Sequence, residues 1–75
     1  MKQKAEMGDW VKITGSWNKN NIGKVVGIIR WLGKRIEYKV LLDKYIKIND
    51  YYYADTFYSY QFRVMSDDEV MVERL

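Results

Sequence analysis

Any chemistry in this 75-residue chain would depend on carboxylates, hydroxyls and amines, because the sequence contains no histidine and no cysteine. The missing histidine removes the commonest general base and metal ligand, and the missing cysteine excludes thiolate sites and disulfides. No nucleophile stands beside a plausible base in the sequence. Gly23-Lys24 lacks the upstream glycine and the following Ser or Thr of a phosphate-binding P-loop. The sequence predicts a protein that is not an enzyme and has no catalytic residues, cofactor or small-molecule substrate.

The one cluster of carboxylates is Asp67-Asp68-Glu69. Three acidic residues could hold Mg²⁺ or Ca²⁺, which prefer oxygen ligands. However, no glycine-spaced loop and no further ligand lies nearby in the sequence. A solvated turn is therefore the favoured interpretation, and no metal site is predicted.

Aromatic residues offer a second kind of chemistry, since stacking and pocket-filling need no catalytic group. The chain has three Trp, seven Tyr and two Phe, more than a core of this size can enclose. Trp17 lies in a polar loop with Lys19 and Asn20, where nothing local would cover its ring. It is either a contact residue for a base or a protein pocket, or a lid folded over the end of the domain.

The run Tyr51-Tyr52-Tyr53 cannot bury all three rings in a strand, since neighbouring side chains point to opposite faces. With Tyr58, these residues predict an exposed aromatic surface suited to a protein partner. The alternative is that they protect a sheet edge by packing against the C-terminal segment.

Positive charge is concentrated in the first part of the chain. Residues 1–49 contain eleven basic and four acidic residues, whereas residues 50–75 contain two basic and six acidic ones. Several cations would share an outer face if the first three strands are neighbours, and such a face would attract phosphates; the alternative is ordinary solubilising charge. The predicted contacts for nucleic acid or another partner are Lys12, Trp17, Lys19, Asn20, Lys24, Arg30, Lys34, Arg35 and Lys39.

Short strands must position these residues. Alternating apolar residues predict strands over 9–14, 23–31 and 35–42, the last with Ile36, Tyr38, Val40 and Leu42 facing the core. Gly27, inside the second strand, predicts a bend that turns both Val25 and Ile28 inward. Leu32-Gly33-Lys34 predicts a tight hairpin turn.

The second half is less regular. Ile46 and Ile48 have strand spacing. Because tyrosine favours strands, 51–53 is expected to form a fourth strand or to continue the preceding one past a bulge. Residues 54–61 have no clear pattern, and a closing strand is predicted over 62–65. Ser66 and Glu69 have the spacing of a capping box, yet the alternation Val70-Met71-Val72 favours a short strand over 69–74 rather than a helical turn.

The stretch from Gly8 to Ile28 resembles the KOW motif of SH3-like barrels in ribosomal proteins and transcription elongation factors. The matching pattern is Gly-Asp-x-Val-x-Ile-x-Gly, a short loop, then Ile-Gly-x-Val-x-x-Ile. The matching positions are Gly8, Asp9, Val11, Ile13, Gly15, Ile22, Gly23, Val25 and Ile28. The segment from Tyr60 to Met65 resembles the closing strand of such barrels. These barrels have a single 3₁₀ turn before that strand, so the resemblance implies such a turn over 57–60. The resemblance covers about a third of the chain and implies the fold rather than one particular function.

The sequence as a whole predicts an all-β domain spanning 1–75: a single small SH3-like barrel of five or six mostly antiparallel strands, with residues 1–7 flexible. The expected function is a non-catalytic binding module for nucleic acid or a nucleoprotein machine such as the ribosome or RNA polymerase. The alternative is a small protein-binding regulator or inhibitor that uses the tyrosine surface and the acidic C-terminal half. No apolar run approaches the roughly 20 residues that span a bilayer, so a cytoplasmic location without membrane contact is expected.

Overall fold

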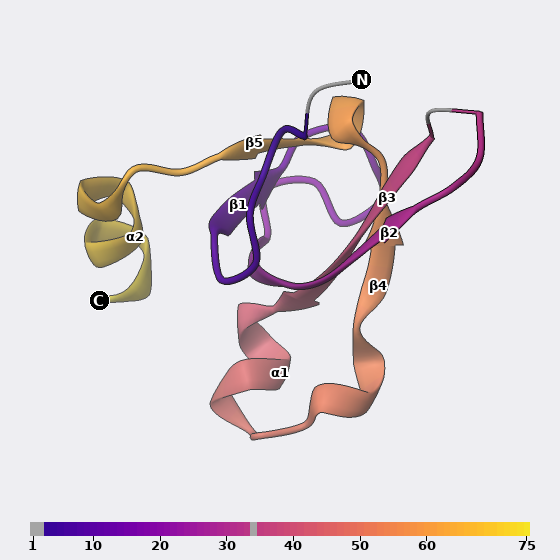
Figure 1. Cartoon of the computed structure of the whole chain (residues 1–75). Helices are drawn as coiled ribbons and strands as arrows, with labels where there is room; N and C mark the ends of the chain where they lie inside the picture. The colour runs from indigo at the N-terminus through magenta and orange to yellow at the C-terminus, as the bar shows by residue number, and fades with distance from the viewer. Residues whose placement is uncertain (1–2, 34) are drawn as a thin grey trace.

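The core of this protein is one sheet of five strands, each antiparallel to its neighbours. A computed structural model describes residues 3–33 and 35–75. The strand order is β4-β3-β2-β1-β5 (Figure 1), so the predicted all-β class is confirmed. Within the described residues the sheet is open, with β4 and β5 as its edges. The strands are β1 (Trp10–Ile13), β2 (Ile22–Arg30), β3 (Ile36–Leu42), β4 (Asp55–Phe57) and β5 (Phe62–Val64).

Side chains alternate between the two faces of β3, and the face that the sequence predicts to be buried is buried. Ile36, Tyr38, Val40 and Leu42 are buried and form one cluster with Val11, Ile13, Val25, Phe57 and Phe62. The Tyr38 ring meets Phe62 edge-on, with centroids 5.1 Å apart, and its hydroxyl accepts the Lys4 backbone N–H at 2.8 Å. Leu41, on the opposite face, is also buried, next to the helix that follows β3.

Two glycines shape β2. A side chain at Gly23 would place its Cβ 2.5 Å from Val40 Cγ1 and 2.8 Å from the Leu41 carbonyl oxygen, so the neighbouring strand leaves no room for one. At Gly27 the pairing with β3 shifts register, which confirms the predicted bend. Val25 is buried and Ile28 packs against the same core, because the bulge changes which residues face inward.

The strands predicted at 46–48 and 51–53 are wrong, whereas the closing strand predicted over 62–65 is confirmed as β5. Residues Asp43–Lys47 form helix α1, and Tyr51–Tyr53 form the 3₁₀ turn η1. Asn49 adopts a left-handed φ of 55° just past the helix, where this conformation commonly ends helices. The Asp50 carboxylate then accepts the Tyr52 backbone N–H at 3.2 Å. These local hydrogen bonds outweigh the β preference of the three tyrosines.

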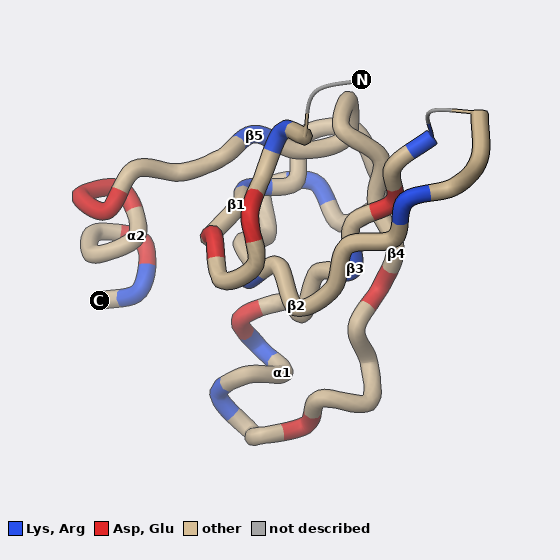
Figure 2. The backbone as a smooth tube through the Cα atoms, viewed as in Figure 1, with Lys and Arg blue, Asp and Glu red and all other residues tan. Residues whose placement is uncertain are grey.

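The C-terminal segment is a helix, so the strand predicted over 69–74 is wrong. Helix α2 (Asp67–Arg74) starts at the predicted capping box, in which Ser66 and Glu69 exchange two 3.2 Å hydrogen bonds. It begins with acidic residues and ends with a basic one (Figure 2). None of its residues is buried, and ion pairs of Lys12 with Glu73 and of Arg63 with Glu69 attach it to the sheet.

The 3₁₀ turn predicted before the last strand is present as η2 (Ser59–Gln61). The N-terminal segment lies beside it (Figure 1): the Lys4 ammonium donates to the backbone oxygens of Ser59 and Phe62, and Ala5 is buried in the core. Residues 3–5 are therefore packed, contrary to the flexibility expected for 1–7; residues 1 and 2 lie outside the described part.

Candidate functional site: two aromatic pockets

Edge strand β4 lies between two 3₁₀ turns, each of which presents tyrosines. Turn η1 precedes β4 at the end of the sheet where α1 lies, and η2 follows it at the other end (Figure 1). Neither turn has a buried residue, so its rings stay at the surface. Each turn forms part of a pocket, and the two pockets differ in the charged residue beside the rings.

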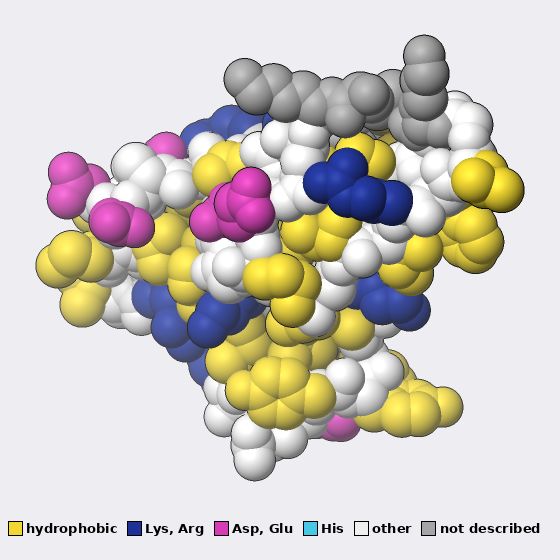
Figure 3. Space-filling model, viewed as in Figure 1, with side chains coloured by type: hydrophobic (Ala, Val, Ile, Leu, Met, Phe, Trp, Pro, Cys, Tyr) yellow, Lys and Arg dark blue, Asp and Glu magenta, His cyan; other side chains and the backbone are white. Residues whose placement is uncertain are grey.

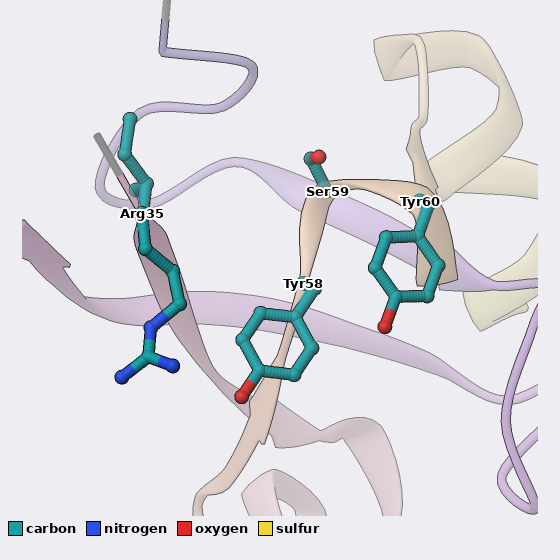
Figure 4. Close-up of a pocket in the computed structure, with 5 residues that line it drawn as sticks. Arg35, Tyr58, Ser59 and Tyr60 are labelled. Carbon is teal, nitrogen blue, oxygen red and sulfur yellow. The ribbon is translucent and has the colours of Figure 1, made fainter. Parts of the chain in front are cut away.

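The first pocket, called the Arg35 pocket, has a volume of about 340 Å³. The rings of Tyr58 and Tyr60 are 5.9 Å apart and within 12° of parallel. Figure 4 shows their faces turned to the same side, with the Arg35 side chain beside Tyr58. Its lining residues are Arg35, Ile36, Tyr58, Ser59 and Tyr60.

Backbone and side-chain contacts hold this pocket in place. The Tyr58 N–H donates to Gln61 Oε1 at 2.9 Å, and the Gln61 N–H donates back to the Tyr58 carbonyl at 2.9 Å. On the hairpin side, the Arg35 guanidinium lies 5.7 Å from the ring of Trp31, and Trp31 Nε1–H donates to Glu37 at 2.8 Å. A cation and two parallel ring faces therefore share one small surface.

The second pocket, called the Trp17 pocket, has a volume of about 270 Å³. Tyr53 stacks on Tyr45 with centroids 5.1 Å apart, and Tyr52 meets Tyr53 edge-on at 5.2 Å. Its lining residues are Trp17, Asn18, Leu42, Tyr45, Tyr52, Tyr53, Ala54 and Asp55. The charged residue here is an acid, whereas the first pocket has an arginine.

Trp17 is brought to this pocket by the loop between β1 and β2. The Asn20 N–H donates to the Ile13 carbonyl at 2.8 Å, and Asn20 has a left-handed φ of 74°, which asparagine tolerates. Trp17 is 83% exposed whereas its neighbour Asn18 is 3% exposed. The lid interpretation of Trp17 is therefore wrong: Asn18 is the residue of this loop that turns inward.

The predicted basic face is divided. Lys12 pairs with Glu73 at 3.0 Å, and Arg30 donates to the Gln3 side chain. Lys24 and Lys39 are exposed on β2 and β3, and Lys19 is exposed beside Trp17; Lys34 lies outside the described residues. Figure 3 shows the cations on this view of the surface as separate patches between hydrophobic side chains.

The structure thus combines the predicted residues differently from the sequence. Trp17 and the tyrosines at 52 and 53 were assigned to separate surfaces but line one pocket, whereas Arg35 and Tyr58 line another. Tyr51 is exposed and lines neither. Sequence reasoning missed Tyr45 and Asp55, because α1 and the pairing of β4 with β3 place them, and no local pattern marked either.

The acidic cluster on α2 serves the fold. Arg63 Nη2 lies 2.7 Å from Glu69 Oε2; the hydrogen bond from Arg63, then that from the Ser66 backbone, lowers the pKa of Glu69 from 4.5 to about 2. Among residues 3–33 and 35–75, no group of three or more acidic side chains could hold a metal ion. In the same residues no helix is long and apolar enough to cross a membrane.

Comparisons of this chain with protein-family models, with curated proteins and with solved structures found no match.

Proposed function

We propose that this protein is a non-catalytic binding module, built on a small SH3-like barrel, that binds single-stranded nucleic acid at the Arg35 pocket. The proposal covers nucleic acid that is free and nucleic acid that is part of a nucleoprotein complex. The observation that carries the proposal is the pair of near-parallel tyrosine rings beside an unburied guanidinium. Stacked bases and a neighbouring phosphate need those two kinds of partner on one surface.

The barrel assignment is supported by three features. Strand β5 returns to pair with β1, a one-turn 3₁₀ segment precedes it, and β2 bends at Gly27. The close approach of the neighbouring strand at Gly23 also suits the glycine at this position of the KOW-like pattern.

The neighbouring hairpin supports the choice of ligand. Trp31 is half exposed and carries the Arg35 guanidinium over its ring, so a further aromatic face lies next to the pocket. Arginine stacks on aromatic rings and also pairs with phosphate. A nucleic-acid strand in the pocket would therefore have aromatic rings for stacking on both sides of the Arg35 guanidinium.

Titration of fluorescent single-stranded oligonucleotides against the protein tests this proposal. Tyr60→Ala is expected to weaken binding by about 1–3 kcal/mol, the contribution of one stacked base. Arg35→Gln is expected to reduce the salt slope of log affinity by about 0.7, since one phosphate contact on a single strand is lost.

Two variants serve as controls. Tyr51→Ala removes an exposed ring outside both pockets. Lys24→Gln removes a cation on β2, at a position that pairs with Trp10 of β1 and Leu41 of β3. Both should bind as the wild type does. The proposal would be contradicted if the oligonucleotides do not bind at low salt. It would also be contradicted if the two control variants weaken oligonucleotide binding as much as Tyr60→Ala does.

A further inference from the structure

The protein already contains one arginine bound by an aromatic ring and a carboxylate. The guanidinium of Arg74, from α2, lies 4.4 Å from the ring centroid of Trp10, and its Nη2 is 3.0 Å from Asp43 Oδ1. Asp43 is 7% exposed and also pairs with Lys47 at 3.3 Å. A ring face and an acid together therefore hold a guanidinium at the surface of this fold.

The Trp17 pocket presents the same two kinds of group, and none of its lining residues is basic. The Lys44 ammonium lies 5.2 Å from the centroid of Tyr45, one of the rings that line the pocket. Four rings line it, and Asp55 is its one charged residue. Asp55 Oδ1 accepts the Thr56 backbone N–H at 2.8 Å, and in the described part of the chain the carboxylate has no ion pair. Asp55 therefore gives the pocket lining a negative charge, which is complementary to a positively charged side chain of another molecule.

The exposure of the rings indicates how such a group would enter. Trp17 and Tyr52 are the outermost rings, 83% and 86% exposed, and Tyr53 is 53% exposed. Tyr45 is half-buried behind Tyr53 and stacks on it. An inserted side chain would cover the outer rings and reach Asp55, which is how aromatic residues anchor protein interfaces.

Asn18 adds a hydrogen-bonding group to the pocket wall. Its side chain is buried, and its Nδ2 has no hydrogen-bond acceptor among the described residues. Because Asn18 lines the pocket, a backbone carbonyl of a bound segment would supply the acceptor that this amide lacks. Such an acceptor suits a peptide.

From these contacts we infer that the Trp17 pocket binds an arginine side chain of a partner protein. A guanidinium is planar, weakly hydrated and able to stack on rings while it forks toward a carboxylate. A lysine ammonium is compact and strongly hydrated, so it loses more on entering a pocket lined by rings. This site goes beyond the nucleic-acid site and uses none of its residues.

A peptide titration followed by ¹H–¹⁵N NMR tests this inference, with the indole N–H of Trp17 as the reporter. The probe is a five-residue peptide, glycine on either side of one arginine. Matched peptides carry lysine, or citrulline, which keeps the shape of arginine without its charge. The arginine peptide is expected to shift the Trp17 signal and to bind about two- to thirty-fold more tightly than the citrulline peptide, the range of a cation–π contact.

Variants locate the effect. Asp55→Asn is expected to weaken the arginine peptide but not the citrulline peptide, whereas Asp68→Asn, an exposed acid on α2, should change neither. Tyr52→Ala should weaken the arginine peptide, and Tyr60→Ala, in the other pocket, should not. The dispersion of the amide signals shows whether each variant is folded.

Three results would overturn the inference. Equal binding of arginine and citrulline would mean that the pocket recognises shape without charge. Lysine binding as tightly as arginine would remove the role of the planar guanidinium. A single-stranded oligonucleotide that shifts the Trp17 signal more than the arginine peptide does would assign the pocket to nucleic acid. None of these results depends on whether the Arg35 pocket binds nucleic acid.

Discussion

The two ends of strand β4 carry similar aromatic residues beside opposite charges. At η2, Tyr58 and Tyr60 lie beside Arg35; at η1, Tyr52 and Tyr53 lie in a pocket with Asp55. Exposed tyrosines alone therefore do not indicate a ligand. The charged residue supplied by the strands around each turn decides whether the rings favour an anionic or a cationic partner.

The two pockets also differ in how they are supported. Turn η2 is tied to the N-terminal segment by the Lys4 ammonium and is followed directly by buried Phe62. Turn η1 is capped by Asp50 and rests on Tyr45 of α1. The Trp17 pocket further needs the loop between β1 and β2, so it combines residues 17 and 18 with residues from the distant segment 42–55.

The largest expected effect is a loss of folding stability, which would disrupt both pockets together. Gly23→Ala places a Cβ against Val40 and the Leu41 backbone, and such overpacking costs about 1–3 kcal/mol of folding free energy. Gly27→Ala is the matched control, since its Cβ would lie 3.3 Å from Lys39 Cβ, a less severe approach than at Gly23. Thermal melts should show the larger loss at Gly23; equal losses would contradict the role of the close approach.

Deleting one ring from each pocket and measuring both ligands would test most directly whether the two pockets are separate sites. Tyr60→Ala should weaken oligonucleotide binding by about 1–3 kcal/mol and leave the arginine peptide unaffected. Tyr52→Ala should have the reverse pattern, because its ring belongs to the other pocket. Isothermal titration of both ligands against both variants measures this. If each variant weakens both ligands alike, the two pockets are not separate sites.

A smaller effect is expected for the stability of Trp17→Ala. The Trp17 ring is 83% exposed in the wild type. Its removal should therefore change the free energy of unfolding by no more than about 0.5 kcal/mol, as surface substitutions usually do. Trp10→Ala is the matched control and should cost more, because that ring is half-buried and contacts Arg74. A Trp17→Ala variant as destabilised as Trp10→Ala would show that the loop is structural.

The smallest expected effect concerns pH and involves neither pocket. The pKa of Glu69 is lowered from 4.5 to about 2 by Arg63 and Ser66, so its stabilisation of α2 is complete above about pH 4.5 and is lost as the pH falls toward 2. The group is exposed and screened by solvent, so the change should be modest. Carboxyl ¹³C NMR measures the pKa; a value near 4.5 would contradict the observed ion pair, and Arg63→Gln should bring it close to that value.

Much of the sheet could be predicted from the sequence. The alternation of Ile36, Tyr38 and Val40 determines which face of β3 is buried, since side chains in a strand alternate between faces. Gly27 marked the bend in β2, and the apolar residues at 62–64 marked the closing strand. These features depend on residues close together in the chain.

The helices were harder to predict because two local signals competed in short segments. Tyr51–Tyr53 favour strands, but the cap at Asp50 starts a 3₁₀ turn there. Likewise Ser66 and Glu69 signalled a helix, whereas Val70 and Val72 alternate as in a strand. Ion pairs with Lys12 and Arg63, which come from other strands, attach that helix to the sheet.

For the candidate binding surface, the sequence by itself indicated that aromatic rings exceed what the core can bury. It marked Trp17, Arg35, Tyr58 and the run Tyr51–Tyr53 as candidate contact residues. Only the tertiary structure decided which ring meets which charge. The antiparallel pairing of β4 with β3 brings η2 to Arg35, and the loop after β1 brings Trp17 to η1 and Asp55. Such neighbours are set by strand register across the sheet, and register depends on the packing of the whole core rather than on any local pattern.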